Sequence, residues 1–136
     1  MVAPPPRDTT GPRPIILVVD DSAMIRAAVT KLLTQHHYEI RQAENGRLGL
    51  AAWEQGRDAI QLVLSDVFMP EMDGLSMAQA IRRQSTRIPI LLMSSKLDDN
   101  SRWIAEEAGF RLLPKPFKDE ILLTVVDRLI RTPRPA

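Results

Sequence analysis

The stretch Ile15-Ile16-Leu17-Val18-Val19 runs directly into the two carboxylates of Asp20-Asp21. Three later apolar runs also stop at polar groups: Leu62-Val63-Leu64-Ser65 at Asp66, Ile90-Leu91-Leu92-Met93 at Ser94-Ser95, and Leu112-Leu113-Pro114 at Lys115. Short apolar runs of this kind are typical of buried parallel strands. In open α/β sheets, ligands bind at the carboxyl ends of the strands. Three carboxylates, a hydroxyl and an ammonium at one edge therefore predict a site for a divalent cation and a phosphoryl group.

Strand and helix signals alternate over the rest of the chain. We expect strands near residues 15–20, 38–43, 61–66, 89–94 and 110–114, and helices near 22–35, 46–55, 74–84, 98–107 and 117–131. Residues 38–43 alternate apolar with charged side chains, as an edge strand does. Ser22 is a suitable cap for the first helix, and Asp98 or Asp99 for the fourth. This alternation predicts an α/β fold, a doubly wound parallel sheet with helices on both faces.

Length and composition exclude several classes of protein. The 136 residues suffice for one domain, and 44% apolar residues exclude a wholly disordered chain. A net charge of +1 without charge blocks gives no indication of nucleic-acid or anionic-membrane binding. The absence of cysteine excludes disulfides and thiolate chemistry, and no apolar run is long enough to span a membrane. We expect a disordered Pro-rich tail over 1–13, one folded domain over 14–131, a short tail over 132–136, and a cytoplasmic location.

The clustered carboxylates have an electrostatic consequence. Two like charges about 4 Å apart repel by about 4 kcal/mol at an effective dielectric constant of about 20. A hard divalent cation with oxygen ligands relieves this repulsion, and Mg²⁺ fits because it keeps several waters and accepts phosphate oxygens. The Lys115 ammonium suits one phosphoryl oxygen, and the Ser94 hydroxyl can donate to another.

Four segments together resemble the response-regulator receiver domain, the phosphoacceptor module of two-component signalling. They are Val18-Val19-Asp20-Asp21-Ser22, the loop from Ser65-Asp66 to Asp73-Gly74, Pro89 to Ser95, and Pro114-Lys115-Pro116-Phe117. The resemblance covers roughly residues 14–131. It implies a flavodoxin-like (βα)5 fold with strand order 2-1-3-4-5.

The resemblance also implies a set of metal ligands. Asp21 is expected to bind Mg²⁺ directly, and Asp20 to be a close or water-mediated partner. Asp66 and the backbone carbonyl of Phe68 are expected to complete the protein's share of the coordination.

The same resemblance implies a reaction and its partners. Asp66 is expected to take a phosphoryl group from a phosphohistidine on a sensor histidine kinase or a histidine phosphotransfer protein. Lys115 would bridge Asp66 and the phosphoryl group, and Ser94 would turn inward when the phosphate arrives. The chain is then a signalling phosphoacceptor that assists its own phosphorylation and dephosphorylation, not an enzyme, and it switches binding to a downstream target.

The chain departs from the receiver pattern on the fifth strand. Many receivers have Tyr or Phe three residues before the lysine, where this chain has Leu112. The usual coupling of an aromatic side chain to the switch hydroxyl is therefore in doubt, and Phe110 is expected to pack in the interior.

The expected output surface consists of the fourth helix, the fifth strand and the fifth helix. Trp103 is expected to face solvent there, where it could anchor a partner. The fifth helix has an apolar stripe at helical spacing, which Ile121, Leu123 and Ile130 widen. We therefore expect this surface to bind a partner or a second copy of the chain.

Other functions stay open at this point. The chain could be a receiver cut from a longer regulator, including a transcription factor, whose output domain is missing. A haloacid-dehalogenase-like Mg²⁺-dependent phosphatase also uses an aspartate at a strand end, but it needs a second acid two residues later, where Phe68 stands. A flavodoxin-like cofactor binder would need a Ser/Thr/Gly-rich phosphate loop after the first strand.

Overall fold

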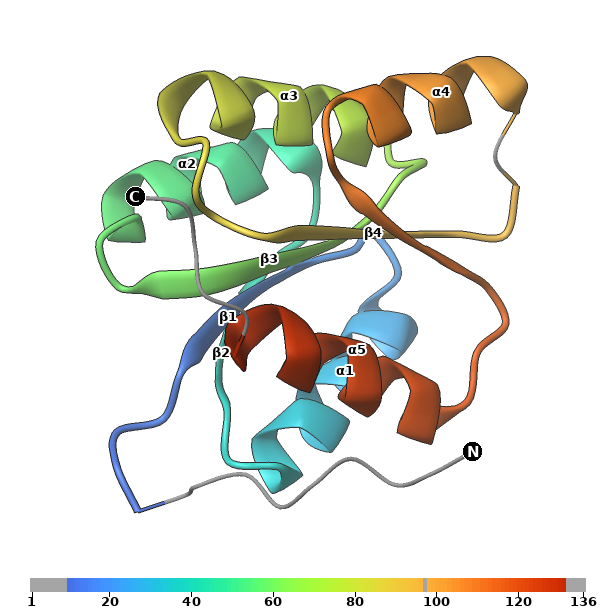
Figure 1. Ribbon diagram of the computed structural model, residues 1–136. Coiled ribbons are helices and arrows are strands. Elements are labelled where there is room, and N and C mark those ends of the chain that lie inside the picture. Colours follow the sequence, from blue (N-terminus) through green and yellow to red (C-terminus); the bar gives the residue numbers. More distant parts are fainter. Residues whose placement is uncertain (1–9, 97, 132–136) are drawn as a thin grey trace.

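A five-stranded parallel sheet forms the centre of the computed structural model, which describes residues 10–96 and 98–131 (Figure 1). The elements in chain order are β1 (Ile15–Val19), α1 (Ala23–Gln35), β2 (Glu39–Ala43), α2 (Gly46–Gly56), β3 (Ile60–Asp66), α3 (Gly74–Gln84), β4 (Ile90–Ser94), α4 (Asp99–Glu107), β5 (Arg111–Pro114) and α5 (Asp119–Arg131). Every expected strand and helix is present, and each end lies within two residues of its predicted position. Ser22 caps α1 and Asp98, not Asp99, caps α4.

The strands pair in the order β2-β1-β3-β4-β5, which confirms the predicted topology and makes β2 an edge strand. Val19 pairs with Ser65, Asp66 with Met93, and Ser94 with Pro114. Because all strands are parallel, the residues that follow their carboxyl ends meet at one edge of the sheet. This register brings the four polar segments predicted from the sequence together.

Helices cover both faces of the sheet. On one face, Leu17 and Val19 pack with residues of α2, α3 and α4; on the other, Ile16 and Val18 pack with residues of α1 and α5. Figure 1 shows the same two layers, with α2, α3 and α4 above the sheet and α1 and α5 below it. Successive side chains of a strand point to opposite faces, so an uninterrupted apolar run supplies both cores at once.

The apolar side chains of α5 lie mostly in the interior, contrary to the expectation from the sequence. Leu123 is only 8% exposed and belongs to the core between the sheet, α1 and α5. Ile121 and Ile130 pack partly against the same core. The wide apolar arc of α5 is therefore used largely within the domain, and it does not by itself indicate a partner.

A buried polar contact joins the start of β2 to α5. The Tyr38 hydroxyl donates a hydrogen bond to the Asp127 carboxylate, although the two residues are 89 positions apart in the chain. Tyr38 is fully buried and Asp127 is 7% exposed. This pair could not be predicted from the sequence, because an Asp in an apolar helix and a Tyr before a strand have no local pattern that links them.

The two predicted tails lie mostly outside the described residues. Residues 10–13 precede β1, and Arg13 donates a 3.5 Å hydrogen bond to the Thr34 carbonyl at the end of α1. None of the helices within 10–96 and 98–131 combines the length and the apolarity needed to cross a membrane.

Candidate functional site

The first two carboxylates of the site lie in the connection between β1 and α1. The Asp20 amide donates to the Ala43 carbonyl (3.1 Å), and its carboxylate Oδ1 accepts from the Ser22 amide (2.9 Å). Asp20 is 1% exposed, whereas Asp21 is exposed. The chain turns sharply after β1 because Asp20 forms this local hydrogen bond and Ser22 caps the helix that follows.

The third carboxylate, Asp66, stands at the last position of β3. Its Oδ1 accepts from the Val67 amide (3.0 Å), and the same amide donates to the Met93 carbonyl of β4 (3.0 Å). Gly74 packs directly over this strand end: its amide donates to the Val67 carbonyl (2.7 Å), and a Cβ at Gly74 would overlap the Asp66 carbonyl oxygen. Glycine is therefore required here by close backbone approach, which holds the loop of residues 67–73 against the site.

Lys115 supplies the positive charge at this edge. Its Nζ lies 3.5 Å from Asp66 Oδ1 and 3.8 Å from Asp20 Oδ2, and its side chain is 18% exposed. The Lys115 amide donates to the Ser94 carbonyl (2.9 Å), which extends the pairing of β4 and β5 by one residue. The ammonium thus lies between the acid of β3 and the acid that follows β1.

The pKa values of Asp20 and Asp66 are both raised. The pKa of Asp20 is raised mainly because burial disfavours the carboxylate, while the Ser22 amide and Lys115 act against that rise. The pKa of Asp66 is also raised, first by burial and then by the Asp20 charge, with Lys115 opposing both. Lys115 alone therefore does not offset the cost of ionising these carboxyls, so a further positive charge at the site would stabilise their charged forms.

The donor set suits a hard cation. Asp20, Asp21 and Asp66 can each offer one carboxylate oxygen, and these oxygens lie within 4.8 Å of one another. Among the described residues, no hydrogen-bond donor reaches the buried Oδ2 of Asp20. Carboxylate oxygens at one point, one of them buried without a donor, match what Mg²⁺ requires. The residues present thus fit the predicted metal, although whether the Phe68 carbonyl joins them stays a prediction.

Ser94 lies at the site but its hydroxyl is engaged elsewhere. It is 3% exposed, and its Oγ donates to the Lys96 carbonyl (2.9 Å) and accepts from the Lys96 amide (3.1 Å). The hydroxyl must leave the Lys96 carbonyl before it can donate to a group bound at Asp66.

The other predicted residues lie farther along the sheet and on α4. Leu112 is half-buried and packs against the core below α2, α3 and α4. Phe110 is 5% exposed in that core, with the Arg82 guanidinium 5.4 Å from its ring centre, so it packs as expected. Trp103 is 62% exposed on α4, which confirms that it faces solvent.

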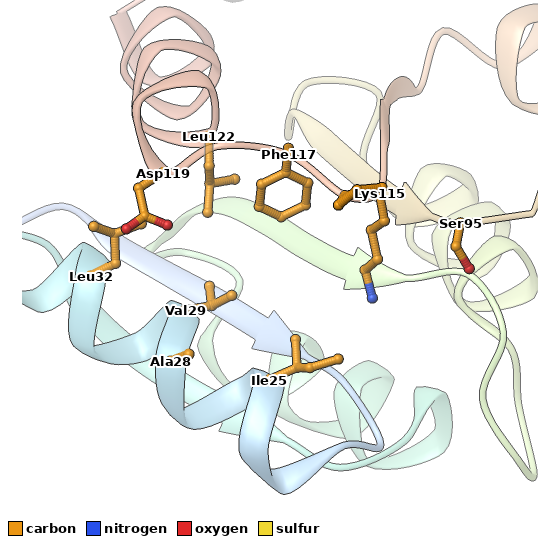
Figure 2. A pocket seen from close by; sticks show the side chains of 10 residues that line it. Ile25, Ala28, Val29, Leu32, Ser95, Lys115, Phe117, Asp119 and Leu122 are labelled. Atoms are coloured by element: carbon orange, nitrogen blue, oxygen red, sulfur yellow. The ribbon is translucent and has the colours of Figure 1, made fainter.

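An apolar pocket of about 440 Å³ adjoins Lys115 between α1 and α5. Figure 2 shows Ile25, Val29 and Leu32 of α1 facing Phe117 and Leu122 across it, while Lys115 extends along its rim. Met24, next to this pocket in the chain, is 83% exposed. The charged site therefore borders an accessible apolar surface.

Arg26 of α1 also contacts the site, which the sequence did not predict. Its Nη1 donates a 2.6 Å hydrogen bond to the Asp20 carbonyl, and its Nε donates to the Gln42 side chain of β2 (3.2 Å). No local sequence pattern links Arg26 to the site, and only the fold brings its side chain back to the strand end.

Comparison with known proteins agrees with the geometry. A probable transcriptional regulatory protein of Picosynechococcus is 34% identical over 122 residues, which are 85% of this chain and 49% of the relative. The sensor histidine kinase CheAY of Helicobacter pylori is 32% identical over 120 residues, 86% of this chain and 15% of the kinase. This chain thus spans about half of the first relative and a small part of the second.

Solved structures give the same result. The chemotaxis protein CheY4 of Vibrio cholerae superposes with a TM-score of 0.78 at 33% identity, covering 86% of this chain and 98% of CheY4. The receiver domain of HemR from Leptospira biflexa gives a TM-score of 0.80 at 25% identity, covering 91% and 99%.

Fold and site together define a flavodoxin-like α/β protein with an acidic, cation-compatible cluster at the carboxyl edge of its sheet. The response regulator receiver domain family matches residues 16–127. The chain belongs to this family, and it is a CheY-like receiver domain of two-component signalling.

Proposed function

We propose that Asp66 accepts a phosphoryl group from a phosphohistidine of a sensor histidine kinase or a histidine phosphotransfer protein. An Asp66 carboxylate oxygen attacks phosphorus in line, the P–N bond breaks, and the imidazole leaves with the electron pair and takes up a proton. The product is an acyl phosphate, which water later hydrolyses to aspartate and phosphate. The observation that carries the proposal is the Lys115 ammonium 3.5 Å from Asp66, beside three clustered carboxylates.

Electrostatics provides most of the rate in such a transfer. Lys115 is close enough to Asp66 to follow an oxygen of the incoming group, and it stays paired with Asp20 meanwhile. Mg²⁺, when bound by Asp20, Asp21, Asp66 and the Phe68 carbonyl, would supply positive charge to the phosphoryl oxygens. The chain provides these groups itself, so small phosphodonors such as acetyl phosphate should serve as well.

The switch follows from the hydrogen bonds of Ser94. In the unphosphorylated domain its hydroxyl donates to the neutral Lys96 carbonyl. A phosphoryl oxygen carries negative charge, and charge-assisted hydrogen bonds are roughly twice as strong as neutral ones. Phosphorylation would therefore draw Ser94 toward Asp66 and release the connection between β4 and α4, with Leu112 in place of the usual aromatic side chain.

Two surfaces are suited to partners. The apolar pocket between α1 and α5, with exposed Met24 beside it, borders Lys115 and fits the protein that delivers the phosphoryl group. Trp103 of α4 lies on the second surface, where a downstream target or a second copy of the chain would read the state of β4 and α4. A partner that prefers the phosphorylated state must in turn favour phosphorylation, because linkage is reciprocal.

The proposal is tested by phosphate incorporation. The protein is incubated with labelled acetyl phosphate and Mg²⁺, and label that is lost in alkali or hydroxylamine is counted. We expect one labile phosphate in the wild type and none in Asp66→Asn. The control Asp58→Asn, which changes an exposed acid in the turn after α2, should label normally. Labelling that persists in Asp66→Asn would refute the assignment. Sustained turnover of unrelated phosphate esters by the wild type would favour a phosphatase.

A further inference from the structure

Arg26 makes two hydrogen bonds that tie three segments together. From the second turn of α1 its Nη1 reaches back to the Asp20 carbonyl (2.6 Å), and its Nε reaches across to the Gln42 side-chain oxygen on β2 (3.2 Å). Both acceptors are neutral oxygens, so Arg26 does not occupy the carboxylates themselves. Lys115, in contrast, lies within 4 Å of two of them.

The bond from Arg26 to the Asp20 carbonyl holds the Asp20–Asp21 peptide, whereas the Asp20 amide belongs to the preceding peptide. The Asp20 amide is held by Ala43 and its carboxylate by the Ser22 amide, at 3.1 and 2.9 Å. β1 ends at Val19, so the Asp20 carbonyl lies beyond the strand, and Arg26 provides it with a donor. The orientation of that carbonyl sets the direction in which the next residue, Asp21, leaves the sheet.

Asp21 is the exposed member of the carboxylate cluster, and the Asp20–Asp21 peptide sets where its side chain begins. We propose that Arg26 is a positioning residue that holds the Asp20–Asp21 peptide so that the Asp21 carboxylate faces Asp66. The proposal rests on the proposed function, in which these acids bind Mg²⁺. The outer groups that orient metal ligands typically change metal affinity by about 10- to 100-fold when they are removed.

The sign of the effect separates positioning from simple electrostatics. Removing a positive charge near an acidic cluster should tighten the binding of a divalent cation if charge alone matters. Removing a positioning residue should weaken it, although the cluster becomes more negative. The experiment measures the Mg²⁺ dissociation constant by calorimetry in Arg26→Met, Arg26→Lys and Arg83→Met, the last being an exposed arginine at the end of α3.

We expect the dissociation constant to rise about tenfold in Arg26→Met and to stay within about twofold of wild type in Arg83→Met. Arg26→Lys keeps the charge, but one ammonium cannot reproduce two bonds made by separate nitrogens, so its affinity should stay near that of Arg26→Met. Unchanged or tighter binding in Arg26→Met would overturn the proposal. Full recovery in Arg26→Lys would contradict the two-bond arrangement, because a single ammonium would then be enough to hold the peptide.

A second measurement needs no metal. The Ser22 amide, bonded to Asp20 Oδ1, should exchange its hydrogen about tenfold faster in Arg26→Met than in the wild type, because the local connection opens more easily. Unchanged exchange would contradict positioning. If the wild type binds no Mg²⁺, the proposed function fails, and the exchange rate still decides whether Arg26 holds this connection.

Discussion

Replacing Asp66 with Asn should stabilise the metal-free domain, although it removes one partner of an ion pair. The Lys115 ammonium lies 3.5 Å from Asp66, which corresponds to an attraction of about 4.7 kcal/mol at an effective dielectric constant of about 20. The Asp20 carboxylate, within 4.8 Å, repels Asp66 by about 3.5 kcal/mol on the same scale, and the exposed Asp21 adds a more strongly screened repulsion. The charge terms thus nearly cancel, and burial decides the sign.

The raised pKa of Asp66, caused mainly by burial, shows that the folded domain disfavours its ionised form. At neutral pH the free energy of unfolding of Asp66→Asn should therefore be about 1 kcal/mol larger than that of the wild type, and its melting temperature about 4 °C higher. The assay is thermal and urea unfolding at pH 7.5 in EDTA. Asp58→Asn removes an exposed acid outside the site and should change stability by less than about 0.5 kcal/mol.

Magnesium should reverse this order. At a concentration ten times its dissociation constant, a ligand that binds only the folded state stabilises by about 1.4 kcal/mol. Wild type should gain this amount, while Asp66→Asn, which lacks one charged ligand, should gain much less. An Asn variant that is less stable than the wild type in EDTA would refute the reasoning, because attraction to Lys115 would then outweigh burial.

Three further predictions concern the same edge of the sheet. In EDTA, the free energy of unfolding of Lys115→Met, measured in urea, should be about 3 kcal/mol lower than that of the wild type, because the buried Asp20 carboxylate loses the ammonium that lies 3.8 Å from it. Mg²⁺ should restore part of this loss. Gly74→Ala should lower the free energy of unfolding by about 3 kcal/mol and reduce phosphate labelling, because the new Cβ would overlap the Asp66 carbonyl oxygen. The control is Gly11→Ala, whose Cβ would meet nothing within 4 Å, and equal stability of the two variants would contradict the overlap. In EDTA, the free energy of unfolding should fall as pH rises from the ordinary carboxyl pKa of 3.8 through the raised pKa values of Asp20 and Asp66, because the folded state binds more protons in that window. If the slope of unfolding free energy against pH is no smaller in Asp66→Asn than in the wild type, Asp66 is excluded as its source.

The sequence alone determined the sheet, its edge strand and the meeting of its polar strand ends. Apolar runs and helical periodicity are local patterns, so the strand that ends at Val19 and the helix capped by Ser22 could be read from a few neighbours. Parallel pairing then requires that residues after different strands share one edge, which is how Asp20, Asp66 and Lys115 were expected together.

The tertiary structure alone decided the contacts between distant side chains. The bond from Tyr38 to Asp127 and that from Arg26 to Gln42 depend on how helices lie against the sheet, which no local pattern encodes. The same holds for Ser94, whose hydroxyl donates to the Lys96 carbonyl and not to the acids. Its rotamer depends on the side chains and backbone that pack around it. Local periodicity places the backbone of each element, whereas the direction of a side chain at the site is set only when all the elements have packed.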